Sequence, residues 1–245
     1  MKITLVVLTK NEIEGLRAVG SRIPKDAVDE VLAVDFQSKD GTRQYLDELG
    51  FKVIDQVVPG RGEAFRLAVE QSQGDALIFF SPDGNEDPAD IPKFRQYFEQ
   101  GNDVVIATRM AKGAHNEEDD QWWRLRKWVN LAFTLIANTL WNRSGTYVTD
   151  TINGFRGILK KTFIDLALDG PGYTIEYQMS IRSFKTRRRI VEFPTYEGHR
   201  IGVGGSPAFR TGIVFIKLLL REVWLSVRQA FRKARSYTPH SSPVR

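Results

Sequence analysis

The sequence predicts an α/β fold, in which helices flank a doubly wound, mostly parallel sheet. Short apolar runs alternate along the chain with segments of helical periodicity, which is the pattern of strands joined by crossover helices. One run, 76–80, is continuously apolar, as expected of a strand that is buried on both faces. It ends in a turn with several acidic residues, 81–88, at the position where open α/β sheets bind ligands. That turn is therefore the predicted centre of the functional site.

The remaining elements follow the same alternation. Strands are expected in the first half of the chain over 3–8, 31–34, 51–54, 76–80 and 103–107. Helices are expected from about Ile13, after an N-cap at Asp40 or Ser38, after the loop 59–62, and over 91–99. Further along we expect an acidic loop over 111–121, an aromatic-rich helix over 122–141, a polar turn over 149–156, a strand over 157–159 with a helix from Lys160, a helix over 172–184 and a strand over 189–193. Residues 1–206 are expected to form one domain.

Composition narrows the class of protein. The 245 residues include no cysteine, which excludes disulfides and a cysteine nucleophile and fits a reducing compartment such as the cytoplasm. The formal charge of +5 favours an anionic partner such as a nucleotide, a phospholipid surface or a nucleic acid. No segment reaches the roughly 18 uninterrupted apolar residues of a membrane-spanning helix. The GxGxxG and GxxxxGK[ST] fingerprints are missing, and no nucleic-acid-binding motif is present.

The C-terminal part predicts an amphipathic helix over 215–235. Its apolar face consists of Ile216, Leu220, Val223, Trp224, Val227 and Phe231. A basic stripe lies about 100° away and consists of Lys217, Arg221, Arg228, Arg232 and Arg235. Such a helix either lies in a membrane interface or packs on the core with a solvated basic side. We expect 207–235 to be a helical region at a membrane surface and 236–245 to be a disordered tail.

Charged residues follow four of the expected strands, namely Glu12, Asp35, Asp83 and Arg109. Any single acidic residue is more often a solvated surface residue, but a series after successive strands is less accidental. A carboxylate after the second strand can accept hydrogen bonds from a base or a ribose. A carboxylate after the fourth can hold a metal that bridges phosphates, and an arginine can balance the remaining phosphate charge. We expect these four side chains to share one edge of the sheet.

Seven motifs occur in the order and at the spacing of a known family. They are LTKNE (8–12), VDFQSKDGT (34–42), GRGEAFRLAV (60–69), GDALIFFSPDGNEDP (74–88), DVVIATR (103–109), TDTINGFRGILKK (149–161) and EFPTYEGHR (192–200). Together they cover most of residues 1–206. The chain thus resembles the family-2 inverting glycosyltransferases with the GT-A (Rossmann-like) fold, and within them the dolichol- and polyprenyl-phosphate mannose synthase branch.

The resemblance implies a set of functional residues. The implied donor-nucleotide site consists of Thr9, Asn11, Glu12, Asp35, Arg61, Ser81 and Asp83. Asp83 and Asn85 are the implied ligands of a Mg²⁺ or Mn²⁺ ion. Asp150 matches an acceptor-side aspartate of the family and is the implied catalytic residue, although an aspartate followed by Thr, Asn and Gly could also cap a turn. Contacts to phosphate or to the acceptor are implied for Arg109, Arg124 and Arg200.

The implied reaction moves a hexose with inversion onto a polyprenyl or dolichyl phosphate, with mannose from GDP-mannose as the expected donor. The protein is then expected to be a peripheral membrane enzyme at the cytoplasmic face. Amphipathic helices would contact the lipid, because tryptophan, as in the helix over 122–141, favours a membrane interface. An alternative is transfer from another nucleotide sugar to a hydroxyl acceptor, which would require Asp150 as a general base.

Three positions depart from the family pattern. Ser81 replaces the first aspartate of the usual DxD motif, which weakens the expected metal site but leaves Asp83 and Asn85. Phe36 replaces a second acidic residue after the second strand. Pro207 stands near the place of a lysine in the family, and the stretch before it is one residue longer than the family's spacing. A further hypothesis, a sugar-nucleotide-binding protein without turnover, rests on Ser81 and Phe36.

Overall fold

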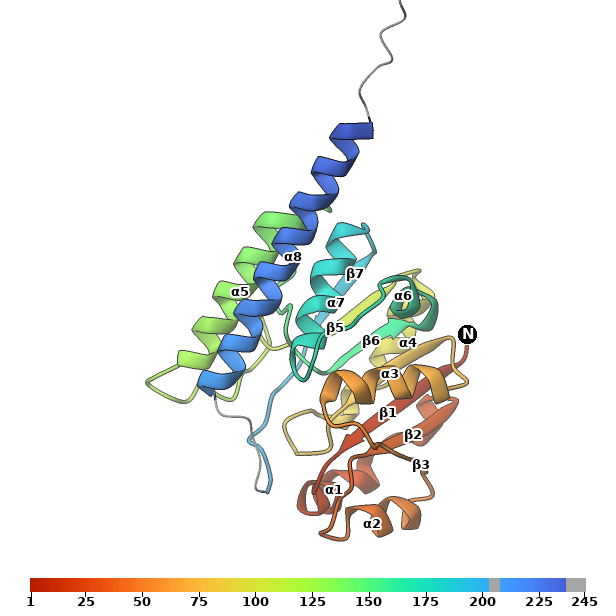
Figure 1. Cartoon of the computed structure of the whole chain (residues 1–245). Coiled ribbons are helices and arrows are strands. Elements are labelled where there is room, and N and C mark those ends of the chain that lie inside the picture. The colour runs from red at the N-terminus through yellow and green to blue at the C-terminus, as the bar shows by residue number, and fades with distance from the viewer. Residues whose placement is uncertain (203–207, 237–245) are drawn as a thin grey trace, which may run out of the picture. The chain divides into compact units, whose positions relative to one another are not determined.

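The computed structural model describes residues 1–202 and 208–236. The chain divides into two compact units, Met1–Gly205 and Ser206–Arg245. The first unit is built on a seven-stranded sheet, and the described part of the second is one long helix (Figure 1). The predicted α/β class with a mostly parallel sheet and a C-terminal helix is therefore confirmed.

The sheet has the strand order β3-β2-β1-β4-β6-β5-β7. Its strands are β1 (Ile3–Thr9), β2 (Glu30–Asp35), β3 (Lys52–Asp55), β4 (Ala76–Phe80), β5 (Val104–Thr108), β6 (Arg156–Leu159) and β7 (Ile190–Pro194). Six of them run in one direction, whereas β6 is antiparallel to both of its neighbours, β4 and β5. The carboxyl ends of β1, β2, β4 and β5 consequently lie along the same edge of the sheet.

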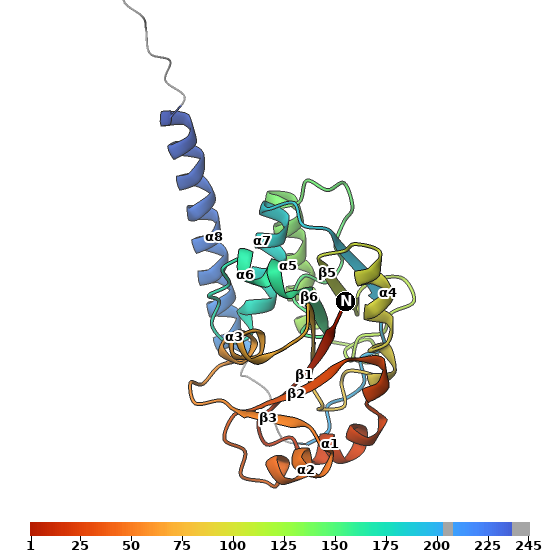
Figure 2. The same cartoon turned by 90° about the vertical axis from the view of Figure 1, so that its right-hand side faces the viewer.

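Helices cover both faces of the sheet. They are α1 (Ile13–Val19), α2 (Thr42–Glu48), α3 (Arg61–Gln71), α4 (Lys93–Glu99), α5 (Leu125–Trp141), α6 (Lys160–Asp165) and α7 (Thr174–Lys185). Short 3₁₀ helices lie over Gly20–Arg22, Lys25–Ala27 and Pro88–Asp90. Helices α1, α2 and α4 pack on one face, and α3, α6 and α7 lie on the other, as Figure 2 shows.

The core explains why the central strands are apolar throughout. Every residue of β1 and β4 is buried, because side chains that alternate between the two faces meet a helix layer on either side. On one face Phe80 contacts Phe155 edge-on, with ring centroids 5.6 Å apart. On the other, Phe79 stacks on Phe65 of α3 at 3.6 Å. A sheet buried on both faces therefore exposes its polar loops mainly at the strand ends.

The first residue of α5 and the N-cap of α2 differ from the sequence expectation. Helix α5 begins at Leu125 rather than at residue 122, because the carboxylate of Glu118 accepts the backbone N–H of Lys127 at 2.8 Å and so caps the first turn there. Helix α2 has Gly41 as its N-cap residue, without a side-chain cap. Asp40 stands one residue before the N-cap but accepts the N–H of Thr42, the first residue of α2, as well as that of Ile13. Ser38 does not cap this helix and accepts the N–H of Asn11 instead.

The second unit is described over α8 (Ala208–Ser236). The exposed apolar side chains of this helix include Ile216, Leu220, Trp224, Val227 and Phe231. Exposed basic side chains flank them, and the guanidinium of Arg228 lies 5.1 Å from the ring of Trp224, one turn away. No helix in the ranges 1–202 and 208–236 combines the length and the apolar character needed to cross a membrane. The predicted disordered tail, apart from Ser236 at the end of α8, and Pro207 lie outside the described residues.

Candidate active site

The ends of β1 and β2 are joined by a buried hydrogen-bond network. Asp35, the last residue of β2, is 3% exposed and accepts the hydroxyl of Thr9 at 2.8 Å. It also accepts the backbone N–H of Ser38 at 3.0 Å and the hydroxyl of Ser38 at 2.6 Å. Asn11 adopts a left-handed backbone with φ of 54°, and its side-chain oxygen accepts the N–H of Lys39 at 2.9 Å. These contacts fix the loops that follow the two strands.

A cavity of about 470 Å³ opens beside this network. The side chains that line it include Asn11, Glu12, Glu14, Lys39, Asp40 and Ile201. Its volume lies in the usual range of small-molecule sites, and its wall mixes carboxylates, an amide and a lysine with aliphatic surface. Such a wall suits a nucleoside, which presents both an apolar ring face and polar edges.

Next to the cavity, one arginine bridges two carboxylates. The guanidinium of Arg200 donates to Glu12 after β1 and to Asp83 after β4, and we call these three residues the Arg200 cluster. Burial raises the pKa of the Glu12 and Asp83 carboxyls, and the charge of Arg200 offsets this only in part. The side chain of Arg200 remains 28% exposed. Both carboxylates are therefore held by a cation that solvent or a ligand can reach.

The turn after β4 carries the residues expected to bind a metal ion. The carboxylate of Asp83 accepts the N–H of Asn85 at 3.2 Å, and the Asn85 amide donates to Glu117 at 3.3 Å. The Asn85 side-chain oxygen is buried and has no hydrogen-bond partner among the residues that the structure describes. Within 1–202 and 208–236, no three acidic or histidine side chains gather as a metal cage. The donor set thus fits a hard cation that takes its other ligands from phosphate and water.

Ser81 stands where the family pattern has a carboxylate, and both its hydroxyl and its backbone N–H are hydrogen-bonded. Its hydroxyl accepts the Nη1 of Arg61 at 3.1 Å, and Arg61 is also ion-paired with the buried Glu176 of α7. The backbone N–H of Ser81 donates to Glu86 at 2.7 Å. Burial and the nearby Asp83 raise the pKa of Glu86 to about 8. Arg61 is therefore directed into the site although the aspartate of the usual motif is missing.

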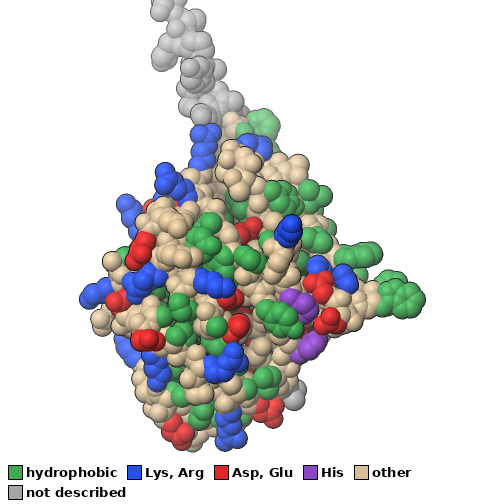
Figure 3. Space-filling view, turned by 180° about the vertical axis from the view of Figure 1, so that it is seen from behind, with side chains coloured by type: hydrophobic (Ala, Val, Ile, Leu, Met, Phe, Trp, Pro, Cys, Tyr) green, Lys and Arg blue, Asp and Glu red, His purple; other side chains and the backbone are tan. Residues whose placement is uncertain are grey.

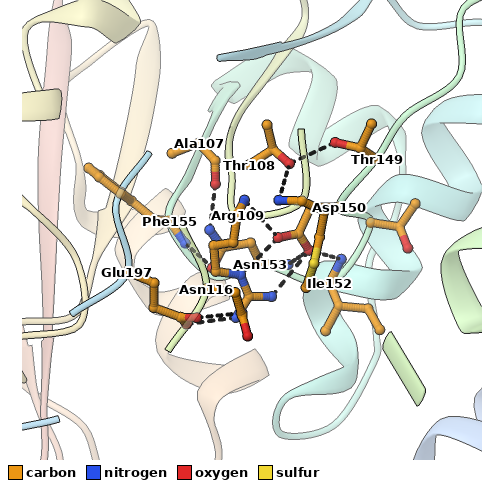
Figure 4. Close-up of polar contacts among 12 residues, drawn as sticks. Ala107, Thr108, Arg109, Asn116, Thr149, Asp150, Ile152, Asn153, Phe155 and Glu197 are labelled. Atoms are coloured by element: carbon orange, nitrogen blue, oxygen red, sulfur yellow. Dashed lines mark hydrogen bonds and ion pairs between the residues drawn. The ribbon is translucent and has the colours of Figure 1, made fainter. Parts of the chain in front are cut away.

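The second charged centre lies at the end of β5 (Figure 4). Arg109 donates from Nε to Oδ2 of Asp150 at 2.8 Å, from Nη2 to Oδ1 at 3.2 Å, and from Nη1 to Glu197 at 2.8 Å. We call Arg109, Asp150 and Glu197 the Arg109 cluster. Asp150 is 1% exposed, and burial alone would raise the pKa of its carboxyl. The charge and hydrogen bonds of Arg109 reverse that effect, so that the pKa is lowered and Asp150 stays ionised.

Asp150 also caps a turn, as the sequence allowed. Its Oδ1 accepts the backbone N–H groups of Asn153 at 3.0 Å and Ile152 at 3.4 Å. From the other side Glu192 of β7 accepts the N–H of Thr149 at 2.6 Å and that of Asp150 at 2.9 Å. The turn 149–153 is thereby fixed at both ends. A structural and a chemical role of Asp150 are compatible, because the carboxylate that holds the turn is also the one paired with Arg109.

The third arginine expected near phosphate has other contacts. Arg124 precedes α5 and donates to the carbonyl oxygen of Asp119 at 2.6 Å, and its guanidinium lies 3.4 Å from the Asp119 carboxylate. Trp122 and Trp123, just before it, are 93% and 77% exposed. Apolar side chains that protrude among charged ones are visible in Figure 3. Arg124 therefore belongs to an exposed aromatic and basic segment rather than to either cluster.

The sequence interpretation missed three carboxylates, of which Glu176 and Glu197 are buried and Glu192 is partly buried. Glu176, Glu192 and Glu197 hold Arg61, the Asp150 turn and Arg109, respectively. Two of them lie in the EFPTYEGHR motif that indicated the family, but no role was assigned to them. For Glu192 and Glu197 the available signal was a carboxylate within or soon after an expected strand, since an unpaired charge that becomes buried there would be costly. Glu176 lies in a helix and gave no such signal.

Comparisons with known proteins identify the family of the chain. Residues 4–164 match the model of the family described as Glycosyl transferase family 2. The chain is 30% identical over 209 residues to an undecaprenyl-phosphate mannosyltransferase of Micrococcus luteus, which covers 79% of this chain and 82% of that protein. It is 26% identical over 228 residues to the glycosyltransferase AglJ of Haloferax volcanii, with 89% and 71% covered.

A solved structure shows the same fold at lower identity. Glucosyl-3-phosphoglycerate synthase from Mycobacterium tuberculosis, in complex with Mn²⁺, UDP-glucose and phosphoglyceric acid, superposes with a TM-score of 0.68 at 22% identity. The match covers 90% of this chain and 79% of that one. The GT-A fold expected from the motifs is thus confirmed. The chain belongs to glycosyl transferase family 2, within its branch of dolichol- and polyprenyl-phosphate mannose synthase-like proteins.

Proposed function

We propose that this glycosyltransferase moves a hexose, with mannose from GDP-mannose as the expected donor, onto a polyprenyl phosphate with inversion at the anomeric carbon. The observation that carries the proposal is the pair of charged clusters at one sheet edge. The Arg200 cluster borders a cavity of nucleoside size, and the Arg109 cluster holds a buried, ionised aspartate. Relatives named as undecaprenyl-phosphate and dolichol-phosphate mannosyltransferases support the donor sugar and the acceptor class.

The donor would bind across the ends of β1, β2 and β4. Its nucleoside would occupy the cavity beside Asn11 and Lys39, and its diphosphate would lie toward Asp83 and Arg61. Asp83 and the unpartnered oxygen of Asn85 would hold a Mg²⁺ or Mn²⁺ ion. When bound, such an ion neutralises charge on the departing diphosphate. Arg61 and Arg200 would add positive charge to the same region, because both are directed there by carboxylates.

The acceptor determines what Asp150 does. A phosphate oxygen of a lipid phosphate is already anionic, so it can attack the anomeric carbon without losing a proton. The bond from that carbon to the diphosphate breaks as the new bond forms, and the nucleoside diphosphate leaves with the electron pair. Asp150, kept ionised by Arg109, would stabilise the positive charge that develops on the sugar and would orient the acceptor.

The membrane side of the proposal rests on exposed apolar surface next to basic side chains. Trp122, Trp123 and Trp128 are exposed in the first unit, and α8 exposes Trp224 and Phe231 in the second. Aromatic side chains beside lysine and arginine favour the interface of anionic membranes. We therefore propose peripheral association with the cytoplasmic face of a membrane, where a lipid phosphate is presented.

The test is a transfer assay with purified protein, GDP-mannose, Mn²⁺ and a short polyprenyl phosphate, with the lipid product measured by mass spectrometry. We expect equal amounts of GDP and mannosyl lipid. The matching polyprenol without phosphate should give no product, because it lacks the anionic nucleophile. Transfer to the alcohol or to a soluble hydroxyl compound would replace the lipid-phosphate acceptor, and nucleotide binding without turnover would favour the hypothesis based on Ser81.

The donor can be tested separately. In a thermal-shift series with GDP, UDP and their mannose and glucose conjugates, the true donor should raise the melting temperature most, since a ligand that binds only the folded state stabilises it. A larger shift with UDP-glucose than with GDP-mannose would contradict the expected donor while leaving the transferase assignment unchanged.

A further inference from the structure

Segment 197–202 joins two parts of the site through its backbone. The N–H of Gly198 donates to the carbonyl of Asn85 at 2.9 Å, and that of Ile201 donates to the carbonyl of Asp83 at 2.7 Å. The N–H of Glu197 donates in the other direction, to the carbonyl of His115 at 3.0 Å. The segment therefore lies between the turn after β4 and the acidic loop that follows β5. Whatever fixes its position affects both.

Glu197 is the side chain at the centre of these contacts. It is 8% exposed and accepts Arg109 Nη1 at 2.8 Å through Oε1. Through Oε2 it accepts the side-chain amide of Asn116 at 2.6 Å and the N–H of Glu117 at 3.2 Å, as Figure 4 shows for Arg109 and Asn116. Both carboxylate oxygens are thus used, one for the arginine that holds Asp150 and one for the acidic loop.

The acidic loop passes the connection on to the turn expected to bind the metal. The carboxylate of Glu117 accepts the amide of Asn85 at 3.3 Å and is 2.9 Å from the guanidinium of Arg126 in the first turn of α5. A continuous series of polar contacts therefore runs from Asp150 through Arg109, Glu197 and Glu117 to Asn85. The N–H of Asn85 donates in turn to Asp83. Glu197, at the centre of this series, belongs to the motif EFPTYEGHR, but the sequence interpretation assigned it no role.

The charges define what Glu197 contributes. Arg109 is one cation between two buried carboxylates, and its bonds to Asp150 use Nε and Nη2 while Nη1 is held by Glu197. Without Glu197, the Nη1 group would be left without its ionic partner, and the guanidinium could rotate away from the two-bond arrangement with Asp150. The acidic loop would at the same time lose the two hydrogen bonds that the Asn116 amide and the Glu117 N–H donate to Glu197.

We propose that Glu197 is a positioning residue for sugar transfer, which orients Arg109 against Asp150 and holds the acidic loop at the same edge of the sheet. This proposal rests on the transferase function proposed above. Glu197 acts through Arg109 and Asn116 and touches neither the donor cavity nor the expected metal ligands through its side chain. The donor should therefore bind normally when Glu197 is changed, while the transfer step should not proceed normally.

Two substitutions separate the two tasks. Glu197→Gln keeps an oxygen that can accept from Asn116 and the Glu117 N–H but removes the charge that faces Arg109. Glu197→Ala removes both. We expect the kcat for mannosyl transfer to fall about 10-fold in E197Q and about 100-fold in E197A, with the KM for the donor within about 2-fold of the unchanged protein. Asp165→Asn is the matched control, because Asp165 of α6 pairs with Arg188 at 2.8 Å outside the site.

A second readout needs no turnover. Trypsin cleaves after basic residues; Lys112 lies in the acidic loop, and Arg124 lies three residues after its end. We expect E197A to be cut in this loop at least 5-fold faster than the unchanged protein, and E197Q at nearly the original rate, because opening of the loop sets the rate of cleavage. The rate of cleavage elsewhere in the chain and the melting temperature of E197Q serve as controls for global unfolding.

The outcomes are distinct. A kcat of E197A equal to that of the unchanged protein, or an equal loss of kcat and of donor affinity in E197Q, overturns the positioning role. Unchanged loop cleavage in E197A also overturns it, even if no acceptor has been found. If the unchanged protein transfers no mannose to any polyprenyl phosphate while E197A shows the faster loop cleavage, the proposed function fails and the structural part of this inference stands.

Discussion

The two clusters have the same composition but opposite electrostatics. Each consists of one arginine between two carboxylates at the carboxyl edge of the sheet. In the Arg200 cluster the pKa values of Glu12 and Asp83 are raised, mainly by burial. In the Arg109 cluster the pKa of Asp150 is lowered although Asp150 is the more deeply buried group. Burial alone therefore does not decide the protonation state of a carboxylate in this site.

The charge of Arg109 and the larger number of donors around Asp150 explain why the pKa of Asp150 is lowered. Asp150 receives two guanidinium N–H groups and the backbone N–H of Arg109, which follows β5, and the backbone N–H groups of Ile152 and Asn153 from its own turn. Asp83 receives one guanidinium contact and the N–H of Asn85. Hydrogen bonds to the charged form lower a carboxyl pKa, so the better-supplied carboxylate stays ionised. With fewer donors, the carboxylates of the Arg200 cluster can release the Arg200 guanidinium to a ligand more readily than Asp150 can release Arg109.

The largest effect, on the rate of transfer, is expected in the Arg109 cluster. Asp150→Asn should reduce the kcat for transfer about 1,000-fold, because it removes the negative charge next to the reacting sugar. The dissociation constant for the donor nucleotide should stay within about 3-fold, since the donor cavity lies at the ends of other strands. Steady-state kinetics and calorimetric titration would measure the two values. An equal loss of both would mean that Asp150 only caps the turn.

The same substitution should destabilise the protein in a pH-dependent way. Asp150→Asn should lower the free energy of unfolding by about 2–3 kcal/mol at pH 7, because Arg109 loses a charged partner. The folded-state pKa of Asp150 is below its unfolded value of 3.8, so its contribution is present above that value and is lost as the pH falls through the folded-state pKa.

Denaturant titrations between pH 7 and pH 3 would measure this dependence. The gap between the two proteins should be constant from pH 7 to about 5 and should narrow below about 4. A gap that widens toward acid would show that Asp150 is protonated in the folded protein, and the contrast between the clusters would then disappear.

A smaller effect, on donor binding, is expected in the Arg200 cluster. Asp83→Asn should raise the dissociation constant for the donor nucleotide about 10- to 30-fold in the presence of Mn²⁺, because one charged ligand of the expected metal is lost. Without divalent metal the two proteins should differ by no more than about 3-fold. Calorimetric titration with and without EDTA would test this. A loss of the same size in EDTA would show that Asp83 acts through Arg200 rather than through a metal.

The smallest effect is expected on membrane binding, which would bring the lipid acceptor to the Arg109 cluster. Replacing Trp224 and Phe231 of α8 by alanine should weaken binding to vesicles with anionic lipids about 5-fold, because both side chains are exposed and apolar. Val57→Ala is the matched control, since Val57 is 75% exposed on the β3 side of the sheet. Co-sedimentation with vesicles would measure the difference. Equal binding of all three proteins would remove α8 from the membrane proposal.

Local sequence was sufficient for much of the framework. The continuous apolar runs of β1 and β4 identified the central strands, because a strand buried on both faces needs apolar residues at every position. Charged residues at the ends of four expected strands predicted that Glu12, Asp35, Asp83 and Arg109 share one edge, since the ends of parallel strands meet there. The predicted start of α5 was less accurate, because the contact that Glu118 makes with Lys127 depends on a residue outside the helix.

By itself, the sequence determined the fold class, the family and which strand ends carry charge, because apolar periodicity and motif order are properties of neighbouring residues. Only the tertiary structure decided how those charges are paired. Arg200 reaches Glu12 across 188 positions, and Glu197 reaches Arg109 across 88. The antiparallel insertion of β6 between β4 and β5, which brings the Asp150 turn to the end of β5, likewise arises from long-range pairing. The pKa of a buried carboxyl depends on such partners, and no local pattern specifies them.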